Sequence, residues 1–271
     1  MSYHNRKKQM TGRSKKKSSP KLSEKFPFLS KIELLSQQFL QAFPRVRLFF
    51  RWSFRLIIFV FLIDIGYLIA IWPEWKWYAE GPIIKSAFIE NYERKSWQNR
   101  SLPKLRWSPI SWQQIPDHMV RAALTAEDSR FFSHDGIDTE AFKKAMEYNW
   151  SQKRFVYGAS TITQQTVKNY YLSSSRNPLR KWHELLLTFA MEQNLKKSRI
   201  LTLYLNVAEF GPGIYGIEAA SQRYWGISAA QLNKTQAIEL AATLPAPRKH
   251  NPRTRSKFFL KQKKKITRNM G

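Results

Sequence analysis

The sequence predicts a mainly α-helical domain that follows one N-terminal transmembrane helix. The first observation behind this prediction is a single long apolar run, Leu56 to Trp72, in a chain of 271 residues. The second is that apolar residues after this run recur at helical spacing between capping residues. The third is that no segment shows the alternation of apolar and polar residues expected of a half-buried strand.

The composition limits the classes of chemistry and partner. The length allows one domain of about 150–200 residues with appendages. The chain has no cysteine, which excludes disulfides, thiolate metal sites and a cysteine nucleophile. Its formal net charge is +27, so an anionic partner is expected, such as nucleic acid, phospholipid headgroups or a pyrophosphate substrate. Charge alone does not choose among these partners.

Residues 1–55 form a basic arm that is expected to be cytoplasmic. The arm holds 14 Lys or Arg residues and only two acids, Glu24 and Glu33. About the first 25 residues are predicted to be disordered, because they combine high charge with few apolar residues. Residues 32–43 could form a short amphipathic helix that lies on lipid headgroups.

Residues 56–72 are predicted to form the transmembrane helix; the alternative is a buried helix of a soluble core. The 17 residues would span about 26 Å as a helix, close to a bilayer core of about 30 Å. Asp64 costs about 2.5–3.5 kcal/mol at mid-membrane, whereas the twelve Leu, Ile, Val and Phe residues contribute about 4–7 kcal/mol in the other direction. Insertion is therefore favoured.

The flanks of this run predict its orientation. Basic residues precede it, and aromatic residues follow it, so the N-terminus should stay in the cytoplasm and the rest of the chain should face outward. A cleavable signal peptide is disfavoured, because the run begins far from residue 1 and no small-residue cleavage site follows. The aromatic belt consists of Trp72, Trp75, Trp77 and Tyr78.

Three further segments are expected after the membrane helix. Residues 73–106 read as a juxtamembrane connector, because they are rich in Trp, Pro and charge and show no period. Residues 107–250 should form the catalytic domain. Residues 251–271 form a basic tail; from Arg248 onward the chain holds ten basic residues and no acid. We expect this tail to be disordered rather than folded, with its cations attracted to anionic lipid.

Helix signals divide the predicted catalytic domain. Asp117 is expected to cap a helix that ends near Glu127, and Thr139 to cap a helix that runs to Asn149, before a mobile loop at residues 150–158. Thr161 and Gln164 fit a capping box, and Asn177-Pro178 marks another helix start. Three more helices are predicted at residues 198–207, 214–225 and 235–244.

Candidate catalytic residues begin at the end of the first of these helices. Glu127 and Asp128 are adjacent, so on a helix they point about 100° apart, and one would be a base while the other supports it. Ordinary salt bridges are the alternative for such a pair. The company of Phe131, His134 and Gly136 within ten residues weighs against that alternative.

His134 could be a metal ligand or a general base. A structural hydrogen-bonding role is favoured, because no second His lies at ligand spacing. The sequence also has no Gly-rich phosphate loop, no HExxH pair and no GxSxG elbow around Ser160. Nucleotide-dependent and serine-hydrolase chemistry therefore have little support.

Four cations lie in or near the segment that leads to a second carboxylate, Glu184. They could be a solvated helix face, and Arg180 could pair with Glu184 at i, i+4 for about 0.2–0.5 kcal/mol. Their proximity to hydroxyl and amide donors favours instead a cradle for a diphosphate with sugar-binding groups nearby. The cations are Lys168, Arg176, Arg180 and Lys181, and the donors are Ser160, Thr161, Gln164 and Gln165.

Five ordered motifs resemble those of glycosyltransferase family 51, and closely those of its monofunctional biosynthetic peptidoglycan transglycosylases. With the sequence between them they cover residues 120–250 or so. The motifs are EDSRFFSHDG (127–136), GASTITQQTVKN (158–169), RKWHE (180–184), KSRILTLYLN (197–206) and EFGPGIYGIEAASQRYWG (209–226).

The resemblance implies a lysozyme-like, mainly α fold with one membrane helix. Such an enzyme polymerises lipid II into β-1,4 glycan strands on the outer face of the bacterial inner membrane. The growing chain on undecaprenyl pyrophosphate is the donor, lipid II is the acceptor, and undecaprenyl diphosphate is released with inversion at the anomeric carbon. Expected partners are these lipids, the membrane and other cell wall synthesis proteins, but no nucleic acid.

The resemblance also implies roles for residues of this sequence. Glu127 would be the general base for the acceptor C4 hydroxyl, and Glu184 the second carboxylate. Lys168 and Arg176 would hold the donor pyrophosphate, with Lys181 in support. No cofactor is required; a divalent cation, Mg²⁺ or Mn²⁺, could assist, but no DxD-type pair is present and no metal ligand is assigned. The other implied substrate-binding residues are Asp128, Phe131, His134, Ser160, Thr161, Gln164, Gln165, Asn169 and Arg180.

One position departs from the family pattern, which usually has Glu where this chain has Thr202. We place Thr202 on a supporting helix; if that were wrong, Glu209 would become the candidate substitute. Two other classes of protein were weighed. A lytic lysozyme-type enzyme would also use a lone Glu but has no need of a pyrophosphate-binding cluster, and a membrane-tethered basic binding protein would explain the charge without the motifs.

Overall fold

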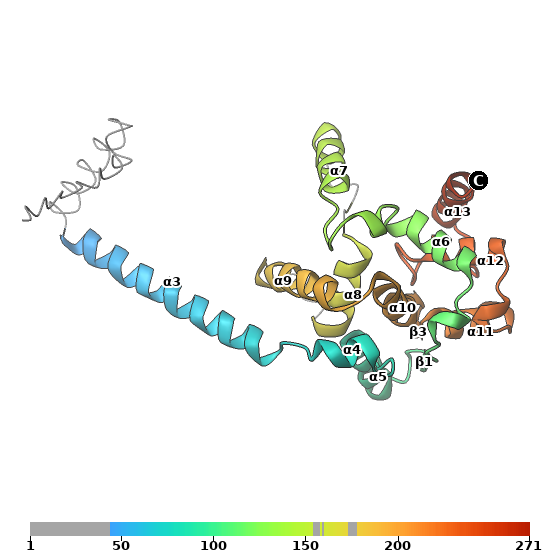
Figure 1. The fold of residues 1–271 in the computed structure, drawn as a ribbon, viewed down its shortest axis with the longest axis horizontal. Helices are drawn as coiled ribbons and strands as arrows, with labels where there is room; N and C mark the ends of the chain where they lie inside the picture. Colours follow the sequence, from blue (N-terminus) through green and yellow to red (C-terminus); the bar gives the residue numbers. More distant parts are fainter. Residues whose placement is uncertain (1–43, 154–157, 159, 173–177) are drawn as a thin grey trace, which may run out of the picture. The chain divides into compact units, whose positions relative to one another are not determined.

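The computed structural model describes residues 44–153, 158, 160–172 and 178–271. These residues form helices and one small sheet (Figure 1), which confirms the mainly α prediction. The chain divides into two units, Met1–Tyr67 and Leu68–Gly271, and each is described by itself. The expected disordered start of the chain and the amphipathic helix at 32–43 lie outside the described residues.

Helix α3, Pro44–Ala70, carries the apolar run. It begins at Pro44 rather than at residue 56, because the basic stretch before the run contains no helix breaker and proline fits the first helical turn. It ends before Pro73, since the residue before a proline is disfavoured in a helix. Residues 45–70 are long and apolar enough to cross a membrane, and only 6% of the apolar window is buried. A soluble core helix would be mostly buried, so this exposure favours a membrane helix.

The second unit begins with two helices in the segment predicted to be a connector. Helix α4 spans Trp75–Glu80 and helix α5 spans Ala87–Gln98. Trp75, Ile89 and Tyr92 belong to the main hydrophobic core. The connector prediction is therefore wrong for these residues. Two short helices that each bury one or two side chains leave too few apolar positions for a period to show in the sequence.

The core of this unit is built around helix α10, Lys197–Val207, whose residues 200–207 are all buried. It packs against α8, Ile162–Tyr171, α9, Pro178–Asn194, and α11, Ile217–Trp225. The remaining main helices are α6 (Asp117–Glu127), α7 (Thr139–Ser151) and α12 (Lys234–Thr243), with short 3-10 helices at Trp112–Gln114, Phe131–Ser133 and Ala229–Gln231.

A three-stranded sheet is also present, although no segment of the sequence shows strand alternation. Strand β3, Ile214–Tyr215, lies between β1, Arg106–Trp107, which runs parallel to it, and β2, Glu209–Gly211, which runs antiparallel. Strands of two or three residues are too short to show alternation. Because β3 takes residues that were predicted to be helical, α11 begins only after Gly216, at φ 81°. A Cβ there would lie 2.8 Å from the Asn206 carbonyl oxygen.

The helix ends confirm some of the predicted capping residues and correct others. The Thr161 and Gln164 capping box is present, and α9 begins at Pro178 as predicted. The cap of α7 is Asp138 rather than Thr139, since the Asp138 carboxylate accepts a hydrogen bond from the Ala141 N–H at 2.8 Å. Asp117 is the first residue of α6 rather than its cap, and Pro116 precedes it.

The basic tail is not disordered but folds as helix α13, Lys257–Asn269. The Ser256 hydroxyl caps it, and Phe259 and Ile266 are fully buried. The helix packs against α12 and α6. Phe259 and Ile266 stand seven residues apart and therefore share one helix face. The prediction of a disordered tail was wrong because charged residues outnumber the two buried apolar residues that anchor the helix.

Shortening the anchor Ile266 to Val should therefore destabilise the folded domain. We expect Ile266→Val to lower the free energy of unfolding by about 0.5–1.5 kcal/mol, because a buried methyl group is lost. Leu260→Val is the matched control at a position of the same helix that is 43% exposed, and its effect should stay within about 0.5 kcal/mol. Denaturant unfolding of the parent and the two variants measures the free energy of unfolding of each. If neither substitution changed it measurably, α13 would not be docked on the domain.

Candidate active site

The Glu127 carboxyl lies where two cavities meet. A cavity of about 1320 Å³ is lined by the end of α6, by Gly158 and Ser160, by Pro245 and by α13. A second cavity of about 560 Å³ lies toward Asp138 and α7. Both are lined by Glu127 and Ser160. The half-buried Glu127 thus sits beside open space large enough for sugar rings.

The hydrogen bonds of Glu127 fix its orientation. Its Oε2 accepts a hydrogen bond from Gln165 Nε2 at 2.7 Å, and the Gln165 Oε1 in turn accepts one from the Tyr204 hydroxyl at 3.4 Å. Burial raises the pKa of Glu127, and the neighbouring Asp128 raises it further; the Gln165 hydrogen bond, Lys168 and Lys265 act in the opposite direction. A raised pKa makes the ionised carboxylate a stronger base toward a hydroxyl.

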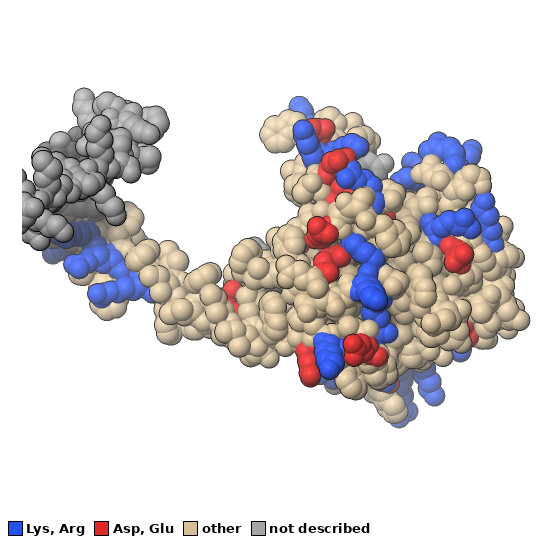
Figure 2. All heavy atoms as spheres, in the orientation of Figure 1, with Lys and Arg blue, Asp and Glu red and all other residues tan. Residues whose placement is uncertain are grey.

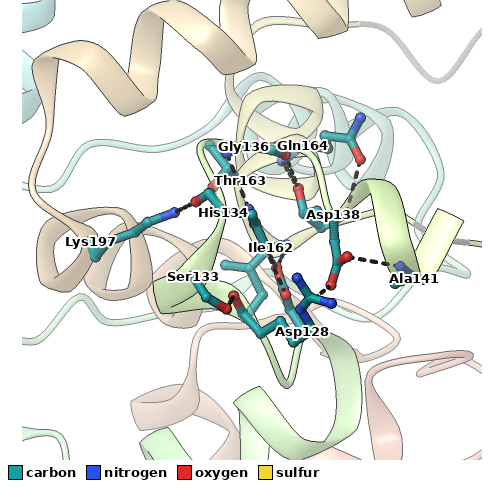
Figure 3. A network of polar contacts seen from close by, with 12 residues as sticks. Asp128, Ser133, His134, Gly136, Asp138, Ala141, Ile162, Thr163, Gln164 and Lys197 are labelled. Carbon is teal, nitrogen blue, oxygen red and sulfur yellow. Dashed lines mark hydrogen bonds and ion pairs between the residues drawn. The ribbon is translucent and has the colours of Figure 1, made fainter.

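Asp128 belongs to a network of polar contacts around the loop that follows α6 (Figure 3). Its buried carboxylate accepts hydrogen bonds from His134 Nε2 at 3.0 Å and from the Ile162 N–H at 3.0 Å. The Gly136 N–H donates to His134 Nδ1 at 3.2 Å, so Nδ1 accepts and Nε2 carries the proton. Asp128 therefore ties the end of α6 to the start of α8, and His134 has the structural hydrogen-bonding role favoured from the sequence.

Gly136 allows this network to close. It has φ +94°, and a Cβ would lie 2.7 Å from the Thr188 side chain, so a larger residue would meet both backbone strain and a clash. Its carbonyl oxygen accepts a hydrogen bond from the Thr161 hydroxyl at 2.6 Å. The loop after α6 is thereby held against the first turn of α8. Helix α8 also carries Gln165 and Lys168.

The other predicted substrate-binding residues fall into two groups. Phe131, Thr161 and Gln164 are buried, and Thr161 and Gln164 form the capping box of α8. These three side chains support the site from within the protein core. Ser160 is exposed and lines both cavities, and Asn169 is half-buried on α8. Arg176 lies outside the described residues, so its role stays a prediction.

A cation cluster surrounds Glu184, whose carboxylate is buried on α9. Arg180 Nη1 donates to Glu184 Oε2 at 3.1 Å and Lys181 pairs with Oε1, so the pairing of Arg180 with Glu184 that was left open is present. Both carboxylate oxygens are thus occupied by cations. Glu184 therefore holds the heads of Arg180 and Lys181 together.

Lys168 and Arg180 keep donors available. Burial lowers the pKa of Lys168; Glu184 acts against this and the cations Arg180 and Lys181 act with it. Within the described residues no carboxylate pairs directly with Lys168, and Arg180 Nε is buried without a hydrogen-bond partner. Glu127 and Glu184 both raise the pKa of Lys168, so both carboxylates lie within electrostatic reach of this ammonium. An anionic group bound here would regain the hydrogen bonds that these donors lack.

One group of side chains has the composition of a metal site. Asp128, His134 and Asp138 bring ligand atoms within 4.8 Å of one another. Each is already committed to the protein: Asp128 accepts from His134 and Ile162, and Asp138 accepts from Ala141. These contacts hold the loop after α6 and the start of α7 in place.

Thr202 lies where the sequence analysis placed it, on a supporting helix. It is buried in α10, and its hydroxyl donates to the Ser198 carbonyl oxygen at 2.7 Å. Glu209, the candidate substitute, belongs to β2 and pairs with Arg248 at 2.8 Å. Neither residue lines the two cavities at Glu127.

One wall of the larger cavity was not predicted from the sequence. Five cations of α13 line it together with Glu127, and the tail that carries them was expected to be disordered. The spacing of four of them could have identified this wall, because residues at i, i+3, i+4 and i+7 share one face of a helix. These four are Lys261, Lys264, Lys265 and Arg268, and the fifth is Lys263.

The two shifted groups predict a bell-shaped pH dependence. If Glu127 must be ionised, kcat/KM should rise with pH through its raised pKa; if Lys168 must be charged, kcat/KM should fall as pH passes its lowered pKa. Initial rates of glycan formation across pH measure both limbs. Lys168→Arg should retain activity longer on the basic side, because guanidinium stays charged. A basic limb unchanged in that variant would show that Lys168 does not set it.

Fold and site together define a helical, carbohydrate-active enzyme in which a half-buried carboxylate lies within electrostatic reach of a lysine ammonium. Comparison with known proteins makes this specific. The Transglycosylase family model matches residues 96–271, well over half of the chain. The chain belongs to the transglycosylase family, which confirms the expected lysozyme-like helical class. The match includes α13, so the domain extends beyond the predicted limit at residue 250.

Individual relatives carry a more specific description. A biosynthetic peptidoglycan transglycosylase of Bordetella avium is 36% identical over 222 residues, covering 80% of this chain and 92% of the relative. One from Nitrosospira multiformis is 35% identical and covers 82% and 97%. One from a Janthinobacterium species is 42% identical over 168 residues, covering 62% and 72%.

Proposed function

We propose that this protein is a peptidoglycan glycosyltransferase that polymerises lipid II into β-1,4 glycan strands and releases undecaprenyl diphosphate. The observation that carries the proposal is the placement of Glu127 beside a cavity with the ammonium of Lys168 within its electrostatic reach. Family membership and the description of its relatives support the same conclusion.

The proposed reaction assigns one task to each side of the site. Glu127 takes the proton of the acceptor C4 hydroxyl, whose oxygen attacks the anomeric carbon of the donor. The bond from that carbon to the diphosphate oxygen breaks, and the electron pair stays on the leaving diphosphate. Lys168, with Arg176 and Lys181, stabilises the charge that develops there. Attack opposite to the leaving group inverts the anomeric carbon.

Glu184 acts through the cations that it holds. Its two oxygens fix Arg180 and Lys181, which keeps both heads in place before the diphosphate arrives, and such preorganisation is what makes electrostatic stabilisation effective. A divalent cation, Mg²⁺ or Mn²⁺, stays a predicted aid to departure of the diphosphate, without assigned ligands.

A lytic enzyme of lysozyme type is the competing class, and a direct assay separates the two. The purified full-length protein is incubated either with lipid II and no nucleotide or with preformed peptidoglycan. We expect polymer in the first reaction and no soluble glycan fragments in the second. Fragments without polymer would replace the proposed synthesis by cleavage.

We further propose that the protein is a single-pass protein of the bacterial inner membrane with a cytoplasmic N-terminus and a periplasmic catalytic domain. The four arginines in the first part of α3, Arg45, Arg47, Arg51 and Arg55, support this orientation. Other cell wall synthesis proteins stay predicted partners.

The orientation is tested by a reporter fused after Gly271. A reporter that is active only outside the cytoplasm should be active, and one that is active only inside should be silent. The opposite pattern would remove the catalytic domain from the compartment proposed for its substrate. A fusion at the N-terminus is the matched control and should give the reverse pattern.

A further inference from the structure

Helix α13 has two faces with different tasks. Phe259 and Ile266 lie on the buried face, and Lys263 on the same side pairs with Glu239. Lys263 also lines the large cavity, but four other cations of that lining lie on the opposite face of α13, since they are about half a turn away at 100° per residue. Figure 2 shows Lys and Arg side chains gathered where Figure 1 places α13. The four are Lys261, Lys264, Lys265 and Arg268.

The charges of this row are not neutralised within the part of the chain that the structure describes. None of the four makes an ion pair there, whereas Lys263 and Arg255, outside the row, both pair with Glu239. Among the residues that line the cavity, Glu127 is the one acid. Like charges held side by side repel one another, so the row is suited to an anionic ligand that enters the cavity.

The row lines a cavity that the α8–α9 cluster, which consists of Lys168, Arg180 and Lys181, does not line. The lining of the large cavity contains Glu127 and the α13 cations but none of Lys168, Arg180 and Lys181. The proposed function gives the donor diphosphate to that α8–α9 cluster. The substrate that offers its hydroxyl to Glu127 from the large cavity is then the acceptor, and its anionic groups must be met by other cations.

We propose that α13 is the acceptor-binding wall of the cleft, where the row Lys261, Lys264, Lys265 and Arg268 binds the anionic groups of the lipid-linked acceptor. The inference rests on the proposed function. The row covers seven residue steps, about 10 Å along the helix, so it can meet several anionic groups at once. Phe258 and Leu260 also line the cavity and supply apolar surface for sugar rings.

Lys265 has a second consequence within this arrangement. It lines both cavities beside Glu127 and favours the ionised form of that carboxylate. The other groups that face Glu127 are Asp128 at the end of α6, Gln165 and Lys168 on α8, and Tyr204 on α10. Loss of Lys265 should therefore move the acidic limb of kcat/KM to higher pH.

The test separates acceptor from donor binding. A preformed tetrasaccharide diphospholipid serves as saturating donor, and lipid II is varied as acceptor. The triple variant Lys261→Gln, Lys264→Gln, Arg268→Gln should raise the KM for lipid II by about 10–100-fold, the scale of one or two lost charge-assisted contacts. Binding of a phosphoglycolipid that mimics the donor should stay within about twofold. Lys257→Gln is the matched control, because Lys257 is an exposed cation of α13 that does not line the cavity.

Two arms identify the anionic group. Lipid II with amidated peptide carboxylates is compared with intact lipid II. If the triple variant raises the KM for both lipids equally, the row binds the diphosphate. If the rise in KM is smaller for the amidated lipid, the row binds the stem peptide. An unchanged KM, or equal weakening of donor-mimic binding, would overturn the proposal. If the parent made no polymer, the proposed function would fail first, and direct binding of lipid II to parent and variant would still decide whether the row binds an acceptor.

Lys265→Gln provides an independent readout. We expect the acidic limb of its kcat/KM profile to move to higher pH, whereas the Lys257→Gln profile should match the parent. An unmoved limb would remove Lys265 from the environment of Glu127. A purely structural effect of either substitution would appear as a lower melting temperature without a shift of the limb.

Discussion

Replacing Glu127 by Gln should lower turnover by roughly 10²–10⁴, equivalent to about 3–5 kcal/mol of barrier. The amide keeps the size of the side chain and can still bond to Gln165, but it cannot accept the proton of the acceptor hydroxyl. Rates of lipid II polymerisation measure the loss. The donor-mimicking phosphoglycolipid should bind within about tenfold of the parent, since its affinity comes mainly from Lys168 and the neighbouring cations.

This substitution should not unfold the protein. The raised pKa of Glu127 means that the fold favours the neutral carboxyl, so its contribution to stability is present below the unfolded pKa and is lost as pH rises through the folded one. A neutral amide avoids this loss at neutral pH. We expect the melting temperature of Glu127→Gln to equal or exceed that of the parent.

Glu184→Gln is the control for the assignment of the base. It leaves Arg180 and Lys181 without the carboxylate that both contact, so donor-mimic binding and turnover should fall together. If Glu127→Gln polymerised at near the parent rate while Glu184→Gln were inactive, the two roles would have to be exchanged.

Lys168→Ala should lower the catalytic rate by about a hundredfold or more, the scale of losing a preorganised electrostatic contact. Its melting temperature should change little, because burial already disfavours the charged form and no carboxylate within the described residues pairs with it directly. Lys181→Ala is the matched control: its side chain is 47% exposed and paired with Glu184, so its effect should be smaller. A loss of folding as large as the loss of rate would make Lys168 structural.

Local signals in the sequence were sufficient for much of the fold. The Thr161 capping box and the Pro178 helix start are decided by a few adjacent residues, and the structure has both. The helix predicted to end near Glu127 is also present. These features depend on short-range chemistry that is visible in any window of the chain.

Features that depend on tertiary packing were not predictable in this way. Phe259 and Ile266 dock α13 although they are surrounded by charge, and Trp75 and Ile89 bring the expected connector into the core. The burial of Glu184 likewise depends on the packing of α9 against α8 and α4. Such partners contribute energy only after the chain has folded, so periodicity alone could not show them.

The most direct test of the account is polymerisation of lipid II by the purified full-length protein without nucleotide, run beside Glu127→Gln. The account predicts that the parent releases undecaprenyl diphosphate and forms a polymer that a muramidase digests, and that the variant binds the donor mimic but forms polymer at least about a hundredfold more slowly. Equal polymerisation by parent and variant would contradict the role of Glu127, and absence of polymer from the parent would contradict the proposed function.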